Sequence, residues 1–242
     1  MCIRDSASVM DYAKEIGASL MSLGVDYRYV DNGETWDWWA TDDQQYLDLI
    51  KPNLQGEYQL QNASGVLRAV TALDQELPVT RQAVESAFEK ISLWGRFQRI
   101  PANETDGEIE YILDVAHNAQ AIEQFVETLH SLAPAKKTHL VFGMLKSKDK
   151  QSTIRLLAPH VDDWYLASVN ARRGALAEEL QAKLRECGVK KNTTCYASVR
   201  EALEAATENA SDGHRILAIG SFLVVSQALH FLGLTKRPTM DV

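Results

Sequence analysis

The segment EYILDVAHNAQAIEQFVETL, residues 110–129, joins a strand pattern to a helix pattern. An apolar run stops at Asp114, and from residue 119 apolar side chains recur at the three- and four-residue spacing of an amphipathic helix. The turn Val-Ala-His-Asn connects them without Gly, Ser or Pro. Asn118 is a favoured N-cap residue, so the turn is either a helix cap alone or a cap that also belongs to a ligand site. The pattern leaves these two interpretations equal.

The same alternation continues to the end of the chain. Short apolar segments separated by helical patterns of this length indicate βαβ units, and therefore a mostly parallel sheet with helices on both faces. We predict an α/β, doubly wound domain. Its expected strands are 109–114, 138–143, 162–167, 192–197 and 215–220, and its expected helices are 119–132, 150–158, 175–186, 199–209 and 222–233.

The first hundred residues have a different pattern. PANETDGE, residues 101–108, is polar, contains Pro and Gly, and is the best boundary in the chain. We expect a partial domain over residues 1–100, a linker at 101–107 and the α/β domain at 108–242. The elements expected before the boundary are a helix at 7–23, a hairpin of 25–30 with 35–40, a strand at 46–50, helices at 62–73 and 80–91, and a strand or extended linker at 94–100.

TWDWWA, residues 35–40, places three tryptophans in the expected hairpin. Tryptophans on an exposed strand face would form a stacking platform for a planar ligand. Alternating aromatic residues in a hairpin more often pack against the core of their own domain, and we favour this second interpretation.

Composition and charge narrow the class of protein. The 242 residues are 45% hydrophobic and 24% charged, as in an ordinary globular protein. The net charge of −8 argues against nucleic acid as the main partner, because such binding depends on neutralised phosphates. No apolar run approaches the roughly 20 residues of a membrane helix. Cys2, Cys187 and Cys195 have no metal-ligand spacing and fit a reducing cytoplasm.

Several catalytic motifs are absent from the sequence. No GxGxxG follows a strand, no GxxxxGK[ST] loop occurs, no GxSxG elbow occurs, and the six His residues form no HxxxH pattern. The sequence therefore predicts neither a dinucleotide fingerprint nor a serine-hydrolase triad, and we name no catalytic and no metal-binding residue in it.

Ligands of open α/β sheets bind outside the carboxyl ends of the strands. Three such ends carry suggestive residues: Asp114 to Asn118, Phe142 to Asp149, and Ile219 to Phe222. In the second, a solvated Lys-rich loop with Ser147 or Asp149 as helix cap is the simpler interpretation. In the third, a Ser N-cap after a Gly turn is equally ordinary.

Taken together, the motifs resemble a known family. Asn62-Ala63-Ser64, then Trp94-Gly95-Arg96-Phe97-Gln98, then LDVAHN occur in the order that is typical of Mur-type ligases. FGMLKSKDK, DDWYLA and the Gly-Ser-Phe at the last helix resemble the bifunctional folylpolyglutamate synthase/dihydrofolate synthase branch. The resemblance runs from about residue 8 to the end. It implies ATP-dependent addition of L-glutamate to dihydropteroate or folate through an acyl phosphate.

The resemblance also implies roles for six residues, as contacts to two ligands. The expected ATP-binding residues are Asn62, Arg96 and Asp114, and the expected glutamate-binding residues are His117, Ser221 and, as a weaker candidate, Arg173. ATP and Mg²⁺ are the implied cofactors, small molecules are the implied partners, and we expect a cytoplasmic monomer in full length, with no nucleic acid or membrane partner.

Two departures from the family pattern limit the transfer. Ala119 stands where the family commonly has Pro, which suits a first helical position. The family's phosphate loop, magnesium ligands and pterin pocket belong to an N-terminal region with no counterpart here, so we expect little activity from this chain alone. MCIRDS, residues 1–6, resembles translated adaptor sequence, and we expect the natural protein to continue upstream.

Two alternatives stay open at this stage. One is another Mur-type amide ligase, acting on cell-wall precursors or on cyanophycin. The other is a non-catalytic module that binds a nucleotide or an amino acid and stands alone.

Overall fold

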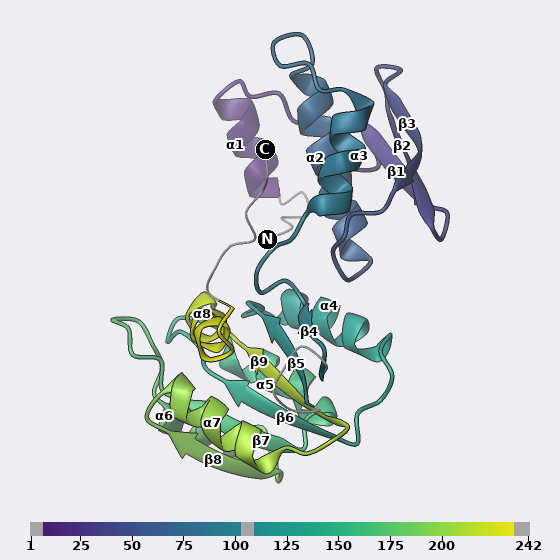
Figure 1. The fold of residues 1–242 in the computed structure, drawn as a ribbon. Coiled ribbons are helices and arrows are strands. Elements are labelled where there is room, and N and C mark those ends of the chain that lie inside the picture. Colours follow the sequence, from purple (N-terminus) through teal and green to yellow (C-terminus); the bar gives the residue numbers. More distant parts are fainter. Residues whose placement is uncertain (1–6, 103–108, 235–242) are drawn as a thin grey trace. The chain divides into compact units, whose positions relative to one another are not determined.

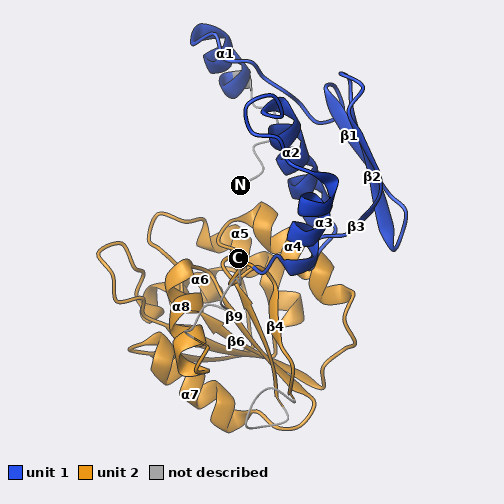
Figure 2. Ribbon diagram, turned by 45° about the horizontal axis from the view of Figure 1, so that its top comes forward, with its two compact units in different colours: residues 1–92 blue, residues 93–242 orange. Residues whose placement is uncertain are grey.

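A computed structural model of the chain describes residues 7–102 and 109–234. The chain divides into two compact units, residues 1–92 and 93–242 (Figure 2). The expected linker at 101–107 falls mostly on residues 103–108, and the MCIRDS segment is 1–6. Both lie outside the described residues, as do residues 235–242.

The first unit combines an antiparallel sheet with helices (Figure 1). The sheet has the order β1-β2-β3, and each strand pairs with the next along the chain. Asp31 and Gly33 form the turn of the first hairpin, where the Asp31 carboxylate accepts a hydrogen bond from the Gly33 N–H at 2.8 Å. The elements are α1 (Ala7–Glu15), β1 (Tyr27–Asp31), β2 (Thr35–Ala40), β3 (Gln45–Ile50), α2 (Tyr58–Ala72) and α3 (Arg81–Lys90).

Trp36 and Trp38 form the centre of this unit's core. Both side chains are fully buried. The Trp36 ring lies 5.8 Å from that of Phe88 on α3, and the Trp38 indole N–H donates to the Ser64 carbonyl on α2 at 3.1 Å. The core interpretation of the tryptophans is therefore confirmed, and the stacking-platform interpretation is wrong for these two.

Two helix boundaries in this unit differ from the expectation. The first helix ends at Glu15 instead of continuing to residue 23, because Gly17 adopts a left-handed φ of 67° that an α-helix cannot contain. The helix expected to begin at Asn62 begins at Tyr58. Asn62 is therefore not a helix cap: it lies in the second turn, exposed, and its amide donates to Gln59 Oε1 at 3.0 Å.

The second unit is the predicted doubly wound domain. Its sheet has the order β4-β5-β9-β6-β7-β8 and is parallel except for β4, which pairs antiparallel with β5 at the edge. The strands are β4 (Gln98–Ile100), β5 (Glu110–Asp114), β6 (Lys137–Phe142), β7 (Asp163–Ala167), β8 (Asn192–Tyr196) and β9 (His214–Ile219). The helices are α4 (Ala119–His130), α5 (Lys150–Leu157), η2 (Ala158–His160), α6 (Ala177–Glu186), α7 (Val199–Asn209) and α8 (Phe222–Phe231).

β4 is the strand that the sequence left undecided. Residues 94–100 were assigned to the first domain, whereas the structure pairs Gln98 with Leu113 and Ile100 with Tyr111 of β5. The segment therefore belongs to the second unit, which begins at Leu93. The sequence could not show this because three residues carry no strand-pairing signal of their own.

Helices cover both faces of the sheet (Figure 1). Because side chains alternate along a strand, Ile112 packs on the face of α4, α5 and α6, whereas Leu113 packs on the face of α7 and α8. Each face has its own buried hydrophobic cluster. No helix in the described ranges is long and apolar enough to cross a membrane.

Candidate functional site

The carboxyl ends of β5, β9 and β6 meet at one edge of the sheet. Asp114 is the register partner of Ile219, and Ile219 is in turn the partner of Phe142. The turn after β5 therefore lies next to Gly220, and Gly220 lies next to Gly143. A side chain at Gly220 would come within 2.5 Å of the Gly143 carbonyl oxygen, and its φ is 117°, so this close approach requires glycine.

Two helices begin at this edge, each with a side-chain cap. Asn118 Oδ1 accepts a hydrogen bond from the Ala121 N–H of α4 at 2.9 Å, and Ser221 Oγ accepts from the Val224 N–H of α8 at 3.2 Å. Both cap predictions are thus confirmed. The first turns of a helix carry N–H groups without helical partners and a partial positive charge. Two such ends side by side favour a ligand with negatively charged groups.

His117 directly precedes the Asn118 cap and is half-buried. Its Nδ1 lies 2.8 Å from the Val115 carbonyl oxygen. A carbonyl can only accept, so Nδ1 carries the proton and donates. In the neutral ring Nε2 is then the acceptor, and it is the atom that the side chain can offer to a hydrogen-bond donor on a ligand.

Asp114 is 5% exposed, and both of its carboxylate oxygens accept backbone hydrogen bonds. The Phe97 N–H donates to Oδ2 at 2.7 Å, and the Ala116 N–H donates to Oδ1 at 2.6 Å. Burial raises the pKa of Asp114 to about 6. The two N–H donors and the positive charge of Arg96 lower this pKa, but burial has the larger effect. The Asp114 carboxylate therefore holds the protein's own backbone at Phe97 and Ala116, and its contact with a nucleotide stays a prediction.

Arg96 lies on the loop that Asp114 holds. The guanidinium is exposed and lies over the ring of Phe222, with 5.8 Å between its central carbon and the ring centroid. Phe222 is the first residue of α8, directly after the Ser221 cap. Arg96, which was assigned to the nucleotide, is thereby placed beside the helix that was assigned to glutamate.

Arg173 lies further along the same edge, in the exposed loop after β7. Its carbonyl oxygen accepts the Lys146 N–H at 2.8 Å, which joins this loop to the one after β6. In that loop Asp149, not Ser147, caps α5, and Lys146 pairs with Glu179 at 3.7 Å. The Lys-rich loop is thus the solvated, capped connection that composition favoured.

Five of the six predicted site residues therefore share one edge of the second unit, and Asn62 belongs to the first unit. The donors at that edge, a guanidinium and two helix N-termini, fit anionic groups such as phosphate and carboxylate, and the His117 imidazole adds an acceptor. The described residues contain no group of three or more His, Cys, Asp or Glu side chains able to hold a metal ion. We therefore derive no step from a metal bound here.

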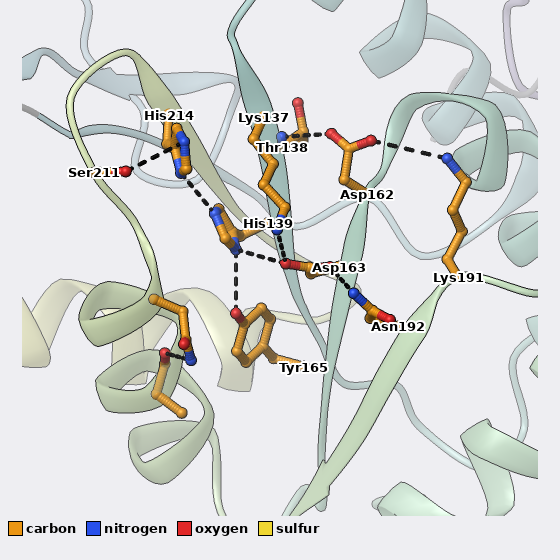
Figure 3. Close-up of polar contacts among 12 residues, drawn as sticks. Lys137, Thr138, His139, Asp162, Asp163, Tyr165, Lys191, Asn192, Ser211 and His214 are labelled. Carbon is orange, nitrogen blue, oxygen red and sulfur yellow. Dashed lines mark hydrogen bonds and ion pairs between the residues drawn. The ribbon is translucent and has the colours of Figure 1, made fainter.

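A second polar cluster lies at the amino ends of the strands, opposite the carboxyl ends that form the ligand edge, and has a structural role (Figure 3). His139 is fully buried, with Nε2 3.0 Å from His214 Nδ1 and Nδ1 3.1 Å from the Tyr165 hydroxyl. The Asp163 carboxylate forms an ion pair with Lys137 at 2.6 Å and accepts a hydrogen bond from the Asn192 side-chain amide at 2.9 Å. Burial lowers the pKa of His139 and raises that of Tyr165 to about 12. These groups satisfy one another at the amino ends of the strands, away from the ligand edge.

Sequence reasoning missed two residues of the site, Phe97 and Phe222. Both occur only inside quoted motifs, without a role of their own. Phe97 has a positive φ of 44°, and a phenylalanine gives no sequence signal for such a conformation because non-glycine residues rarely adopt it. Phe222 could have been noticed as a large aromatic at the first position of a helix. The bond from Ala116 to Asp114 is also readable, because Asp often accepts from the N–H two residues on.

The proteins that this chain resembles in sequence carry the name of a folate ligase. The chain is 30% identical over 226 residues to the dihydrofolate synthase/folylpolyglutamate synthase of Escherichia coli K12, which covers 93% of this chain and 49% of that protein. It is 27% identical over 234 residues to the protein of that name from Haemophilus influenzae, covering 91% and 52%. The chain thus spans about half the length of the curated relatives it matches.

Solved structures match over the same extent. The structure of E. coli FolC in complex with DHPP and ADP has a TM-score of 0.78 at 30% identity, covering 94% of this chain and 50% of that one. A bifunctional folylpolyglutamate synthase/dihydrofolate synthase with Mn, AMPPNP and L-glutamate bound has a TM-score of 0.78 at 31% identity, covering 94% and 51%. The Mur ligase, glutamate ligase domain family matches residues 95–222, the part of the chain that forms the sheet and the edge described above. The chain belongs to that family.

Proposed function

We propose that the whole protein joins L-glutamate to dihydropteroate or a folate at the expense of ATP. The observation that carries this proposal is the similarity, at about 30% identity over 94% of the chain, to a structure named with DHPP and ADP. The anion-binding character of the edge formed by β5, β9 and β6 supports it. The cell-wall and cyanophycin alternatives lose support because the similar curated proteins carry the folate name.

The reaction transfers the γ-phosphoryl group of ATP to the carboxylate of the pterin substrate; the amine of glutamate then attacks the acyl carbon, loses a proton and displaces phosphate. It places two demands on the protein, charge neutralisation and alignment of the amine with the acyl carbon. The described residues serve the first through Arg96. A guanidinium stays charged at all relevant pH values and can donate two parallel hydrogen bonds to phosphate oxygens.

The second demand concerns the incoming glutamate. Its two carboxylates suit the N-terminal ends of α4 and α8, which Asn118 and Ser221 cap. The acceptor Nε2 of His117 suits the ammonium group, or the proton that the amine releases. Arg173, on the neighbouring loop, is a further cation for the side-chain carboxylate of glutamate.

The two remaining predicted residues have less direct support. Asn62 is proposed as a contact on the nucleotide side, from the first unit. Asp114 is proposed to act on the nucleotide through the loop that it holds. We also propose that the first unit, residues 1–92, corresponds to part of a central ATP-binding domain, that the second unit, residues 93–242, is the C-terminal domain, and that the whole protein is a cytoplasmic monomer.

The test is an assay on two proteins, this chain and the protein extended by the upstream reading frame. We expect the extended protein to release ADP only when dihydropteroate or a folate, L-glutamate, ATP and Mg²⁺ are all present. The 242-residue chain should incorporate no radiolabelled glutamate under the same conditions. Robust turnover by the chain alone, or ADP release by the extended protein that does not depend on glutamate, would overturn the proposal.

A further inference from the structure

The backbone on either side of Arg96 has an uncommon conformation. Gly95 and Phe97 both lie in the left-handed region, with φ of 67° and 44°. Glycine adopts this region freely, but for phenylalanine it is rare and persists only where the surrounding structure enforces it. The loop that carries Arg96 is therefore held in place by its surroundings and does not result from local preference.

The contacts that enforce it come mainly from the end of β5, with a ring contact from α4. The Phe97 N–H donates to Asp114 at 2.7 Å, and the Val115 N–H donates to the Gly95 carbonyl at 2.9 Å. The Phe97 ring is buried in the core, with its centroid 5.1 Å from that of Phe125. Both neighbours of Arg96 are thus bonded to the segment 114–115, so the position of its Cα is fixed relative to the β5 end.

The side chain of Arg96 is held separately, by Phe222. This phenylalanine is 62% exposed, so it contributes little to the core. Its ring lies under the Arg96 guanidinium at 5.8 Å, within the range of a cation–π contact. A ring in that place leaves the edge of the guanidinium, where its N–H groups are, open to a ligand.

We propose that Asp114 and Phe222 are positioning residues for Arg96, Asp114 through the backbone and Phe222 through the guanidinium, and that together they present its N–H groups to an anionic phosphate oxygen. The proposal rests on the role of Arg96 in nucleotide binding proposed above. Both oxygens of Asp114 accept backbone hydrogen bonds, from Phe97 and Ala116, and this supports a positioning role.

The order of the Arg96 side chain should follow the ionisation of Asp114. The carboxylate accepts two N–H bonds, whereas the protonated acid accepts them less well on the oxygen that bears the proton. Burial raises the pKa of Asp114 to about 6, and the charged group that opposes this rise is Arg96 itself. His117, on the turn after Asp114, is the other titratable group nearby in sequence and is tied to the Val115 carbonyl.

The experiment uses NMR on the 242-residue chain, with the order parameter and exchange rate of the Arg96 Nε–Hε group as readout. We expect Phe222→Leu to raise the exchange rate about two- to five-fold, the factor equivalent to an exposed cation–π contact. Phe222→Tyr should restore the wild-type value, and Leu223→Ala, a change at the next exposed position of α8, should have no effect. In the wild type the amide protons of Phe97 and Ala116 should titrate with a midpoint near the Asp114 pKa of about 6, and Asp114→Asn should remove that transition.

Two outcomes separate this proposal from the function on which it rests. An Arg96 Nε–Hε group that is equally ordered in the wild type, Phe222→Leu and Asp114→Asn overturns the positioning roles, whatever the nucleotide does. In the whole protein, which includes the region of the family's phosphate loop, addition of ADP should shift the Arg96 resonance. An unmoved resonance of the whole protein at millimolar ADP overturns the nucleotide role of Arg96, even if the variants show that Asp114 and Phe222 order it. Should Asp114→Asn fail to fold, Phe222→Leu and Phe222→Tyr still decide.

Discussion

Asp114 and Ile219 lie opposite one another at the carboxyl ends of two adjacent parallel strands, β5 and β9. This pairing places the turn with His117 directly beside the turn with Ser221, although about a hundred positions separate them in the chain. Each turn then opens a helix whose positive end faces the same edge. The candidate site thus follows from the register of these two strands.

Gly220 should tolerate no side chain. In Gly220→Ala the new Cβ would meet the Gly143 carbonyl at 2.5 Å, in addition to the strain of a φ of 117°. We expect the free energy of unfolding to fall by roughly 2–5 kcal/mol, the sum of backbone strain and overpacking. Gly188→Ala is the matched control, because Gly188 also has a positive φ but open space around it. Urea unfolding that gives equal losses for the two variants would contradict the close approach.

Ser221 should serve both as a helix cap and as part of the ligand edge. Ser221→Ala removes the hydrogen bond to the Val224 N–H and should cost about 1 kcal/mol of stability. Ser198→Ala removes the equivalent cap of α7 and should cost a similar amount. Only Ser221→Ala should raise the KM for L-glutamate in the active whole protein. An equal effect of both variants on KM would reduce Ser221 to a cap.

The buried His139 should make the second unit less stable in acid. Burial lowers its pKa in the folded state, so between the two pKa values the unfolded chain binds a proton that the folded one does not. Stability is then lost as the pH falls through the unfolded value of about 6.5. Asp114 acts in the opposite sense: its raised pKa gives stability at low pH that is lost as the pH rises through about 6.

Comparison with a variant isolates the His139 contribution. The difference in unfolding free energy between the wild type and His139→Asn should shrink as the pH falls from 7 to 5. His230→Asn, at an exposed position on α8, serves as the control and should leave the pH profile unchanged. A difference that stays constant with pH would show that His139 is protonated equally in the folded and unfolded states.

Trp36 and Trp39 differ in what they stabilise, although they lie on the same strand. Trp36 is fully buried, and Trp36→Ala should cost about 3–5 kcal/mol in the first unit. Trp39 lies under the Arg28 guanidinium at 5.4 Å, and the loss of that contact should cost about 1 kcal/mol or less. Hydrogen exchange of the β1–β3 amides measures the loss of stability in Trp36→Ala and in Trp39→Ala. Similar deprotection in these two variants would contradict the assignment of Trp36 to the core.

Hydrophobic periodicity was sufficient to predict the second unit. The strands β5, β6, β7 and β9 are mostly buried, and each α-helix is buried along one face, so these segments carry clear patterns. The first unit was less readable, because α1 ends at a glycine conformation and α2 begins without a side-chain cap at Glu57. The short edge strand β4 depends on pairing with β5, a long-range contact that no local pattern reports.

The site was predictable only in part for a related reason. Asn118 and Ser221 act locally as caps, and sequence preferences report such roles. The role of Asp114 depends on the Phe97 N–H, seventeen positions earlier in the chain, and on burial. The contact between Arg96 and Phe222 joins residues that only the sheet order β5-β9 brings together. Residue identity suggested a ligand for Asp114, and the fold adds two backbone partners that local sequence does not report.

The most direct test of the central claim is an NMR titration of this chain with L-glutamate. We predict saturable shifts at the amides of His117, Asn118, Ser221 and Phe222, and none at the His139–His214 cluster at the amino ends of the strands. Saturable shifts centred on that cluster, or no saturable shift at all, would contradict the assignment of the β5–β9 edge as the glutamate site.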